Sequence, residues 1–479
     1  MTSTPLDLDN IQGDILVGLL KKTETFYFFQ ISDDVNAFRT QLSQLAPLIT
    51  STTAAMDHRK TVSQSKKDAL AQGREPPVVP IAGLNIAFSQ SGLTKMGITG
   101  DIGDVGFKNG QLADALALGD QGSTVNGKFV PDWIPAFKNA IHGVMIFSGD
   151  KQASVDKTLA EVSAILRVGA HDATIHEVLK VVGAVRPENG HEHFGFLDGI
   201  SNPAVEGFDI EKPGQGAVDP KVILTGHDAI LRPAWATDGS FLAFRYLFQL
   251  VPEFNLFLKK NPLPTDSDGN RLTPEQGSEL LGARMVGRWK SGAPVDLTPI
   301  VDDPVLGKDP MRNNDFHYNI ENDFTSQSRC PFAAHTRKTN PRNDLRPEFV
   351  TPHRIIRRGV PFGPEVTPDE AQDNRTHLGR GLLFACYQSN LANGFQFVQK
   401  QWANARGFPP KSTPPGIDPI IGQLNPGDVL PRSMSGTNPA SQDELLGLPI
   451  WVVPRGGEYF FSPSISALRD TFALGVHIH

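Results

Sequence analysis

The chain is poor in cysteine, because its 479 residues include only Cys330 and Cys386. Two thiols cannot build a disulfide framework, and they cannot supply a zinc or iron–sulfur site that needs four thiolates. One disulfide and two free thiols are both compatible with this count. We favour two buried free thiols, because cysteine is among the residues most often buried.

Long apolar runs and an excess of positive charge are also missing. The apolar stretch 15–20 is too short to span a membrane. The net charge is −7, and the chain has no basic run that could follow a phosphate backbone. We therefore expect neither a membrane nor a nucleic acid as a partner. Residues 1–7 lack a basic segment followed by an apolar core, so we expect no secretory leader within the chain.

The first half of the chain alternates strand-like and helix-like patterns. Residues 34–46 carry apolar side chains at helical spacing, whereas the polar, proline-bearing segment 63–80 predicts a loop. The predicted strands are 24–30, 84–88, 141–147 and 175–185, and a second helix is predicted over 154–168. The order β-α-β, a long insertion and then β-α-β is typical of a ferredoxin-like unit.

The second half follows a similar style without a residue-level repeat. Segment 214–227, which bears glycine and aspartate, predicts a linker. Strands are predicted over 241–251, 382–387 and 458–461, and helices from 253 onward, over 394–405 and over 465–474.

One carboxylate, Asp198, lies inside the apolar, glycine-rich stretch 193–203. It is either part of an Asp-Gly turn or an acid held out of water for a purpose. The glycine that follows it would let backbone approach a ligand closely, because it has no Cβ.

Two further stretches could supply partners for this acid. His335 follows an apolar run and precedes a cluster of cations, so it is either a hydrogen-bonded core histidine or an axial haem ligand. In the second case Arg337 and Arg342 would meet the haem propionates. The neighbours Arg357 and Arg358 either form a solvated face, or one of them points inward from a buried strand.

Together these stretches resemble the dye-decolorizing peroxidases, a family of haem enzymes. The family's Gly-x-x-Asp-Gly signature is present as Gly195-Phe-Leu-Asp198-Gly199. Further matching segments are 10–16, 243–249 and 416–422, and the length resembles that of the fungal branch. The resemblance implies an α+β fold of two ferredoxin-like units with antiparallel sheets and peripheral helices. We place the domains at 1–213 and 214–479, with one haem b per chain in the C-terminal unit.

The resemblance also implies roles for individual residues. His335 would be the axial iron ligand, with Asp418 hydrogen-bonded behind it. Asp198 and Arg357 would be the distal acid–base residue and cation. Leu382 and Phe384 match the apolar distal wall, and the expected haem contacts also include Gly199, Ile200, Ser201, Arg337, Asn340, Arg342 and Arg357.

A pocket with such walls would exclude bulky dyes, so electrons would have to reach the haem through the protein. Trp402 lies in a polar helical stretch and matches the oxidisable surface tryptophan of the fungal relatives. It could instead be a helix residue that packs inward. Phe362 replaces a tyrosine that is a second radical site in some relatives, and phenylalanine does not readily form a proton-coupled radical.

The sequence thus predicts a haem peroxidase that reduces hydrogen peroxide and oxidises aromatic small molecules and bulky dyes. The alternative is a haem-binding protein that carries haem or releases its iron through the same His335, without peroxidase turnover. By resemblance to its branch we expect an extracellular protein, with a cytoplasmic location as the alternative.

Overall fold

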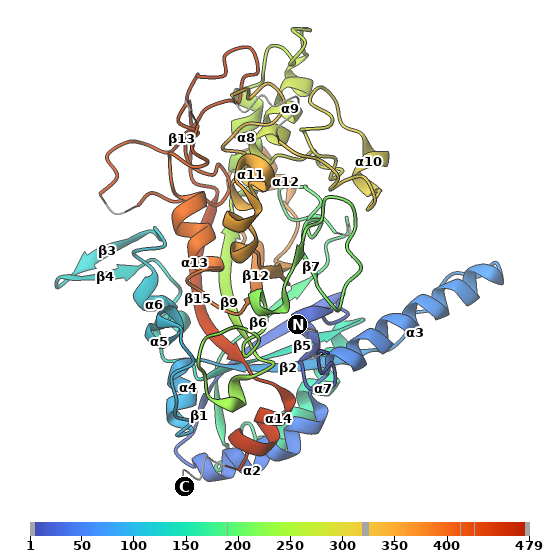
Figure 1. The fold of residues 1–479 in the computed structure, drawn as a ribbon, viewed down its shortest axis with the longest axis vertical. Helices are drawn as coiled ribbons and strands as arrows, with labels where there is room; N and C mark the ends of the chain where they lie inside the picture. Colours follow the sequence, from blue (N-terminus) through green and yellow to red (C-terminus); the bar gives the residue numbers. More distant parts are fainter. Residues whose placement is uncertain (1–4, 189, 319–324, 412, 426, 475–479) are drawn as a thin grey trace.

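The computed structural model describes residues 5–188, 190–318, 325–411, 413–425 and 427–474. Its centre is a 9-stranded sheet with the order β10-β12-β9-β15-β2-β5-β1-β6, and β11 pairs with β12 outside this path. The strands are β1 Thr23–Ile31, β2 Ala82–Phe88, β5 Gly143–Gly149, β6 Ile175–Ala184, β9 Ser240–Gln249, β10 Ile356–Arg357, β11 Val360–Phe362, β12 Gly381–Gln388 and β15 Val452–Ser462. Figure 1 shows β9, β12 and β15 running lengthwise through the middle of the molecule.

Each half of the sheet has ferredoxin-like strand order. In the first half, strands β1, β2, β5 and β6 lie in the order β2-β5-β1-β6, and in the second half β15, β9 and β12 lie side by side with β10 and β11 along β12. All of these pairings are antiparallel. The halves join where β15 meets β2, through the pair Phe461 and Phe88. The predicted α+β fold with two ferredoxin-like units is therefore confirmed, and the two units share one sheet.

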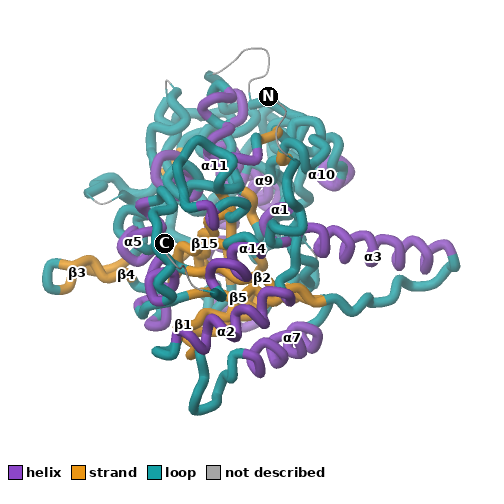
Figure 2. Tube along the Cα trace, turned by 60° about the horizontal axis from the view of Figure 1, so that its bottom comes forward, coloured by secondary structure: helices purple, strands orange, loops and turns teal. Residues whose placement is uncertain are grey.

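Helices cover the faces of this sheet and its ends. They are α1 Gly13–Leu16, α2 Val35–Leu45, α3 Thr52–Ala71, α4 Gln90–Lys95, α5 Val105–Asn109, α6 Gln111–Asp114, α7 Gln152–Ile165, α8 Val251–Lys260, α9 Pro274–Val286, α10 Pro304–Lys308, α11 His335–Thr339, α12 Pro368–Asp373, α13 Phe395–Phe397 and α14 Ile465–Ala467. π-Helical turns at Val398–Ala403 and Leu468–Phe472 extend α13 and α14. Figure 2 shows α2 and α7 beside strands β1, β2 and β5. None of the helices in the described part of the chain has the length and apolar character needed to cross a membrane.

Three two-stranded sheets complete the described strands. They are β3 Gly122–Val125 with β4 Lys128–Pro131, β7 Ala204–Val205 with β8 Ala217–Val218, and β13 Ser433–Met434 with β14 Leu446–Gly447.

The apolar face predicted for the first helix is confirmed. Phe38, Leu42 and Leu45 of α2 are buried in the same core cluster as Phe29 of β1. Asp34 caps the start of the helix, because its side chain accepts a hydrogen bond from the N–H of Ala37.

The loop predicted over 63–80 is wrong for residues 63–71, because α3 continues to Ala71. Figures 1 and 2 both show α3 projecting from the body of the molecule. Such a helix cannot draw its stability from an apolar stripe along its whole length. Ser51 caps its start, and local pairs such as Lys60–Asp57 and Gln64–Asp68 support its exposed surface.

Cys330 and Cys386 are both free and buried, which confirms the expectation for the thiols. The division into domains at residue 213 stays a prediction.

Candidate active site

A cavity lies between the C-terminal half of the sheet and the segments that follow it. Its lining comes from the loop before and after Asp198, from β12, from α11 and from the segments around residues 354 and 420. Among the residues predicted for the site, Asp198, Gly199, Ile200, Ser201, His335, Asn340, Arg342, Arg357, Leu382 and Phe384 line this cavity. Residues from three separate stretches of the sequence, around positions 198, 335 and 357, are thus brought to one place, as the motifs predict.

Asp198 and Arg357 form an ion pair at the cavity. The Nη1 of Arg357 donates to Oδ1 of Asp198 at 2.8 Å, and the N–H of Gly199 donates to the same oxygen at 2.6 Å. Burial alone would raise the pKa of Asp198, but the Arg357 guanidinium and the Gly199 N–H hold this pKa below its usual value. Although 39% of the Asp198 side chain is accessible, that surface opens into the cavity, so burial still acts on the carboxylate.

Backbone pairing fixes the position of Arg357. It belongs to β10, where it pairs with Cys386 of β12. The amide of Asn202 adds a two-way clamp, since its Oδ1 accepts from the Arg357 N–H at 3.0 Å and its Nδ2 donates to the Arg357 carbonyl at 3.1 Å. Asn202 follows the Asp198 loop, so this clamp ties the acid and the cation to each other. Asn202 was not among the predicted site residues.

Glu192 fastens the other end of the same loop. Its carboxylate accepts from the N–H groups of Phe194 and Phe196, both at 2.9 Å, and from Nε2 of Gln249 at 2.5 Å. Glu192 lines the cavity but was not predicted as a site residue. Its sequence context, between two histidines, gives no sign of this role.

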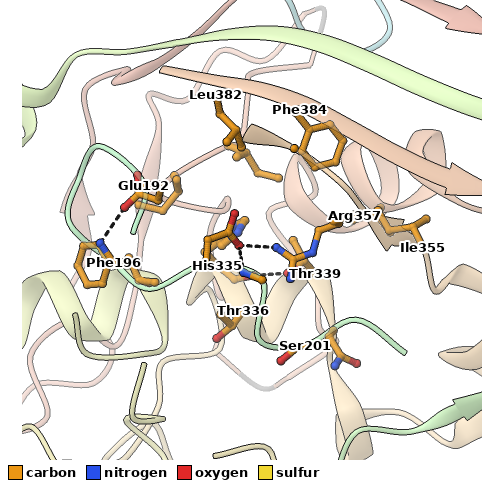
Figure 3. A pocket seen from close by; sticks show the side chains of 18 of the residues that line it. Glu192, Phe196, Ser201, His335, Thr336, Thr339, Ile355, Arg357, Leu382 and Phe384 are labelled. Carbon is orange, nitrogen blue, oxygen red and sulfur yellow. Dashed lines mark hydrogen bonds and ion pairs between the residues drawn. The ribbon is translucent and has the colours of Figure 1, made fainter. Parts of the chain in front are cut away.

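Leu382 and Phe384 form an apolar wall because side chains alternate along a strand. Both lie on one face of β12, and their neighbours Leu383 and Ala385 point into the core on the other face. Figure 3 draws Leu382 and Phe384 at one side of the cavity and Thr336 of α11 at the opposite side.

His335 begins α11 and is paired with a buried carboxylate. Its Nδ1 lies 2.8 Å from Oδ2 of Asp418, which is fully buried. The other carboxylate oxygen of Asp418 accepts from the N–H groups of Ile420 and Ile421 at 2.8 and 3.0 Å. Since Nδ1 is occupied, the imidazole has only Nε2 left to offer to a ligand.

The pair shifts the pKa of both partners. Burial would lower the pKa of His335, but the Asp418 carboxylate outweighs burial and raises it. Burial would raise the pKa of Asp418, but His335 and the two backbone N–H groups lower it. Asp418 is therefore held as a carboxylate against the imidazole.

Arg337 is the site prediction that the structure does not support. It does not line the cavity. Its guanidinium makes two bonds to the Asp344 carboxylate and one to the Cys330 carbonyl, and it lies against the rings of Tyr318 and Phe332. Two residues after His335 on a helix, it points to the opposite side, so we withdraw a propionate contact for Arg337.

Trp402 also differs from its prediction, because it is only 2% exposed and is not a surface residue. Its indole stacks on Phe408 with centroids 5.1 Å apart and meets His353 edge-on at 5.2 Å. His353 lines the cavity. The alternative of an inward-packed helix residue thus describes the position of Trp402, and the indole is separated from the cavity by one ring.

Three arginines at the cavity, one of them buried and two half-buried, have no carboxylate partner among the described residues. Arg288, Arg342 and Arg354 line it, and they form no ion pair within the described residues. They donate mainly to backbone carbonyls and to Asn314. Burial lowers the pKa of Arg288 to about 9 and that of Arg354 to about 10, which indicates a place for an anionic ligand group.

The chain is similar to known proteins over most of its length. Residues 10–187 match the family described as "DyP dimeric alpha+beta barrel domain", and residues 284–408 match "Dyp-type peroxidase, C-terminal". A dye-decolorizing peroxidase of Mycena epipterygia is 46% identical, over 97% of this chain and 86% of that protein. The chain belongs to the dye-decolorizing peroxidase family.

Solved structures of the family match nearly the whole chain. An ancestral D-type dye-decolorizing peroxidase is 57% identical with a TM-score of 0.91, covering 98% of this chain and 100% of that one. A dye-decolorizing peroxidase solved in complex with 2,6-dimethoxyphenol is 45% identical with a TM-score of 0.85, covering 98% and 100%. These matches make the protein a peroxidase and favour this activity over the haem-carrier alternative.

Proposed function

We propose that this dye-decolorizing peroxidase binds one haem b in the cavity, through His335, and uses it to reduce hydrogen peroxide. The observation that carries the proposal is the imidazole whose Nδ1 is held by the buried Asp418, which leaves Nε2 as the free ring nitrogen. A carboxylate in this position strengthens the imidazole as a donor and fixes its ring.

The remaining lining suits a haem. Arg288, Arg342 and Arg354 offer unpaired positive charge to propionates. Asn340 adds a buried Oδ1 that has no hydrogen-bond partner among the described residues. At Gly199 the backbone has φ +79°, and an added Cβ would meet only open space, so the chain can lie against a flat ligand there.

The haem would supply the iron that exchanges electrons with peroxide, and the surrounding residues would move protons and stabilise charge. Asp198 accepts a proton from one peroxide oxygen and returns it to the departing one. Arg357 stabilises the negative charge that develops on the departing oxygen. Leu382 and Phe384 keep that side of the cavity apolar. Because the pKa of Asp198 is lowered, it stays a base in acid, and we expect an acidic optimum.

Aromatic small molecules and dyes are the expected electron donors. The relative in complex with 2,6-dimethoxyphenol supports a phenol as one such donor. For donors too large to enter, we keep Trp402 as an electron-transfer residue that acts from inside the protein, through the His353 ring. Trp402→Phe should then slow the oxidation of a large dye more than that of a small phenol. An equal loss of rate on both donors, or no loss on either, would contradict this role.

An absorption spectrum and a turnover assay test the proposal as a whole. The purified, haem-loaded protein should show a Soret band and bleach an anthraquinone dye only when peroxide is added. A haem spectrum without bleaching would favour a carrier, and the absence of any haem spectrum would overturn the proposal. An extracellular location stays a prediction.

A further inference from the structure

A second line of aromatic rings leads from the cavity into the core. Phe384 and Phe395 both line the cavity, with ring centroids 6.1 Å apart. Behind them lies Tyr459 of β15, whose ring centroid is 6.1 Å from that of Phe395 at an interplanar angle of 65°. Tyr459 is fully buried, so one phenylalanine separates a buried phenol from the cavity.

The phenol of Tyr459 has a carboxylate in hydrogen-bond reach. Its hydroxyl donates to Oδ2 of Asp114 at 2.7 Å. Gln396 donates to the same oxygen at 2.8 Å, and Lys400 forms an ion pair with the other oxygen of Asp114. The carboxylate is thus held in place by two side chains from the helical segment that also carries Phe395.

This environment keeps the phenol protonated until it is oxidised. Burial and then the Asp114 charge raise the pKa of Tyr459 well above its ordinary value. A phenol that loses an electron becomes a strong acid, so its proton must leave with the electron. Asp114 is positioned to take it.

We propose that Tyr459 is an internal redox residue, which gives an electron to the peroxide-oxidised haem site and its proton to Asp114. This inference rests on the proposed haem peroxidase function. The O–H bond of Tyr459 breaks, the proton bonds to Oδ2 of Asp114, and the haem site is reduced by one electron. A neutral tyrosyl radical remains. An aromatic donor then returns the electron and Asp114 returns the proton, which restores the phenol.

Tyr387 provides a matched control in the same sheet. It is also fully buried, and its hydroxyl donates to Oδ2 of Asp14 at 3.0 Å. It lies on the face of β12 opposite to Phe384, it does not line the cavity, and it makes no ring–ring contact among the described residues. The two tyrosines therefore share the acid partner but differ in the aromatic connection.

The test is freeze-quench electron paramagnetic resonance of the haem-loaded protein after one equivalent of hydrogen peroxide, without a donor. Ring-deuterated tyrosine identifies a tyrosyl signal by its altered hyperfine pattern. The signal should appear in the wild type and in Tyr387→Phe, and it should be lost in Tyr459→Phe. Asp114→Asn should also lose it, although Tyr459 is intact there. Soret spectra and circular dichroism of all variants show that haem and fold are retained.

Other outcomes would overturn the inference. The inference about Tyr459 is wrong if the tyrosyl signal persists in Tyr459→Phe or is lost equally in Tyr387→Phe. It is also wrong if a wild type that reacts with peroxide shows no such signal. None of these results contradicts the proposed peroxidase function. A wild type that shows no haem spectrum or no reaction with peroxide contradicts the proposed function itself, and the inference falls with it.

Discussion

Two ion pairs beside the cavity have the same contact distance, but their carboxylates differ greatly in exposure. Arg357 and Asp198 lie 2.8 Å apart with 30% and 39% of their side chains accessible, and both open into the cavity. His335 and Asp418 also lie 2.8 Å apart, but Asp418 is fully buried and His335 is 27% accessible. The first pair can meet a small molecule and exchange protons with it. The second can only orient and polarise the imidazole.

The hydrogen bonds that the two carboxylates accept also differ. Oδ1 of Asp418 accepts hydrogen bonds from two backbone N–H groups, and its Oδ2 faces His335. Both oxygens are therefore bonded to protein groups. Asp198 accepts from Arg357 and from Gly199 on Oδ1, and no hydrogen bond from the described residues reaches its Oδ2. A free carboxylate oxygen at the cavity is what proton transfer requires.

Removing the imidazole of His335 should have the largest effect on the site. His335→Ala should lose most of the bound haem, because it removes the ring nitrogen that is proposed to hold the iron. The absorption spectrum after haem reconstitution measures this, and His335→Gly with added imidazole should recover part of the spectrum. If His335→Ala retains the wild-type haem spectrum and affinity, His335 is not the axial ligand.

Removing the cation at the open pair should have the next largest effect. Arg357→Leu should slow the reaction with peroxide by about 10²–10³-fold, because one preorganised charge is lost. It should also move the acidic limb of the pH–rate profile upward. Arg357 lowers the pKa of Asp198, so without it Asp198 is protonated, and inactive as a base, at a higher pH.

The conservative change Arg357→Lys is the control, because it retains the positive charge. Its acidic limb should lie closer to that of the wild type than the limb of Arg357→Leu. Identical pH profiles for Arg357→Leu and the wild type would mean that the ion pair does not govern the protonation of Asp198.

Weakening the closed pair should have a smaller effect on the rate. Asp418→Asn should reduce activity or haem affinity by about 10–100-fold, which is typical when the partner of a metal-bound histidine is lost. The pH dependence of the peroxide reaction should keep its shape, since Asp198 and Arg357 are unchanged. A shifted acidic limb in this variant would contradict the separation of roles.

Substitutions of Arg342 and Arg337, two arginines of the same segment, should have the smallest effect on the chemistry and should differ from each other. Arg342→Gln should increase the rate of haem dissociation, because Arg342 lines the cavity. Arg337→Gln should instead lower the melting temperature of the apoprotein by removing one partner of the buried pair with Asp344. Haem transfer to apomyoglobin measures the first and calorimetry the second; the reverse pattern would restore Arg337 to the site.

The motifs predicted the centre of the site, because the resemblance assigns Asp198, His335 and Arg357 by position in short segments. They did not predict which of the neighbouring cations face the cavity. Arg288 lies in a segment without a recognisable motif, and Arg354 precedes the strand that carries Arg357. Their clustering depends on tertiary structure, which brings residues 288, 342 and 354 to one place.

Helix geometry explains the error at Arg337. On α11, His335, Thr336 and Thr339 line the cavity, while Arg337 and Lys338 are buried away from it. Residues two positions apart on a helix face opposite sides, but the short segment 335–339 was not predicted to be a helix. Without that assignment, Arg337 and Arg342 were equivalent candidates.

The polarity of neighbouring residues misled two other predictions. The polar composition of 63–80 predicted a loop, whereas α3 is stabilised by its cap and by local side-chain pairs. Lys400 and Gln401 made the segment around Trp402 look exposed, whereas the π-helical turn directs the indole against Val350 and Val398. In both cases polarity alone did not determine the conformation of the segment or the direction of a side chain.

The most direct test of the account is the reaction of haem-loaded Asp198→Ala with hydrogen peroxide, followed by stopped-flow absorption. We expect a resting spectrum like that of the wild type and a reaction slower by about 10²–10⁴-fold, the usual contribution of a positioned acid–base group. A reaction at the wild-type rate, with haem bound, would contradict the assignment of Asp198 and with it the functional difference between the two ion pairs.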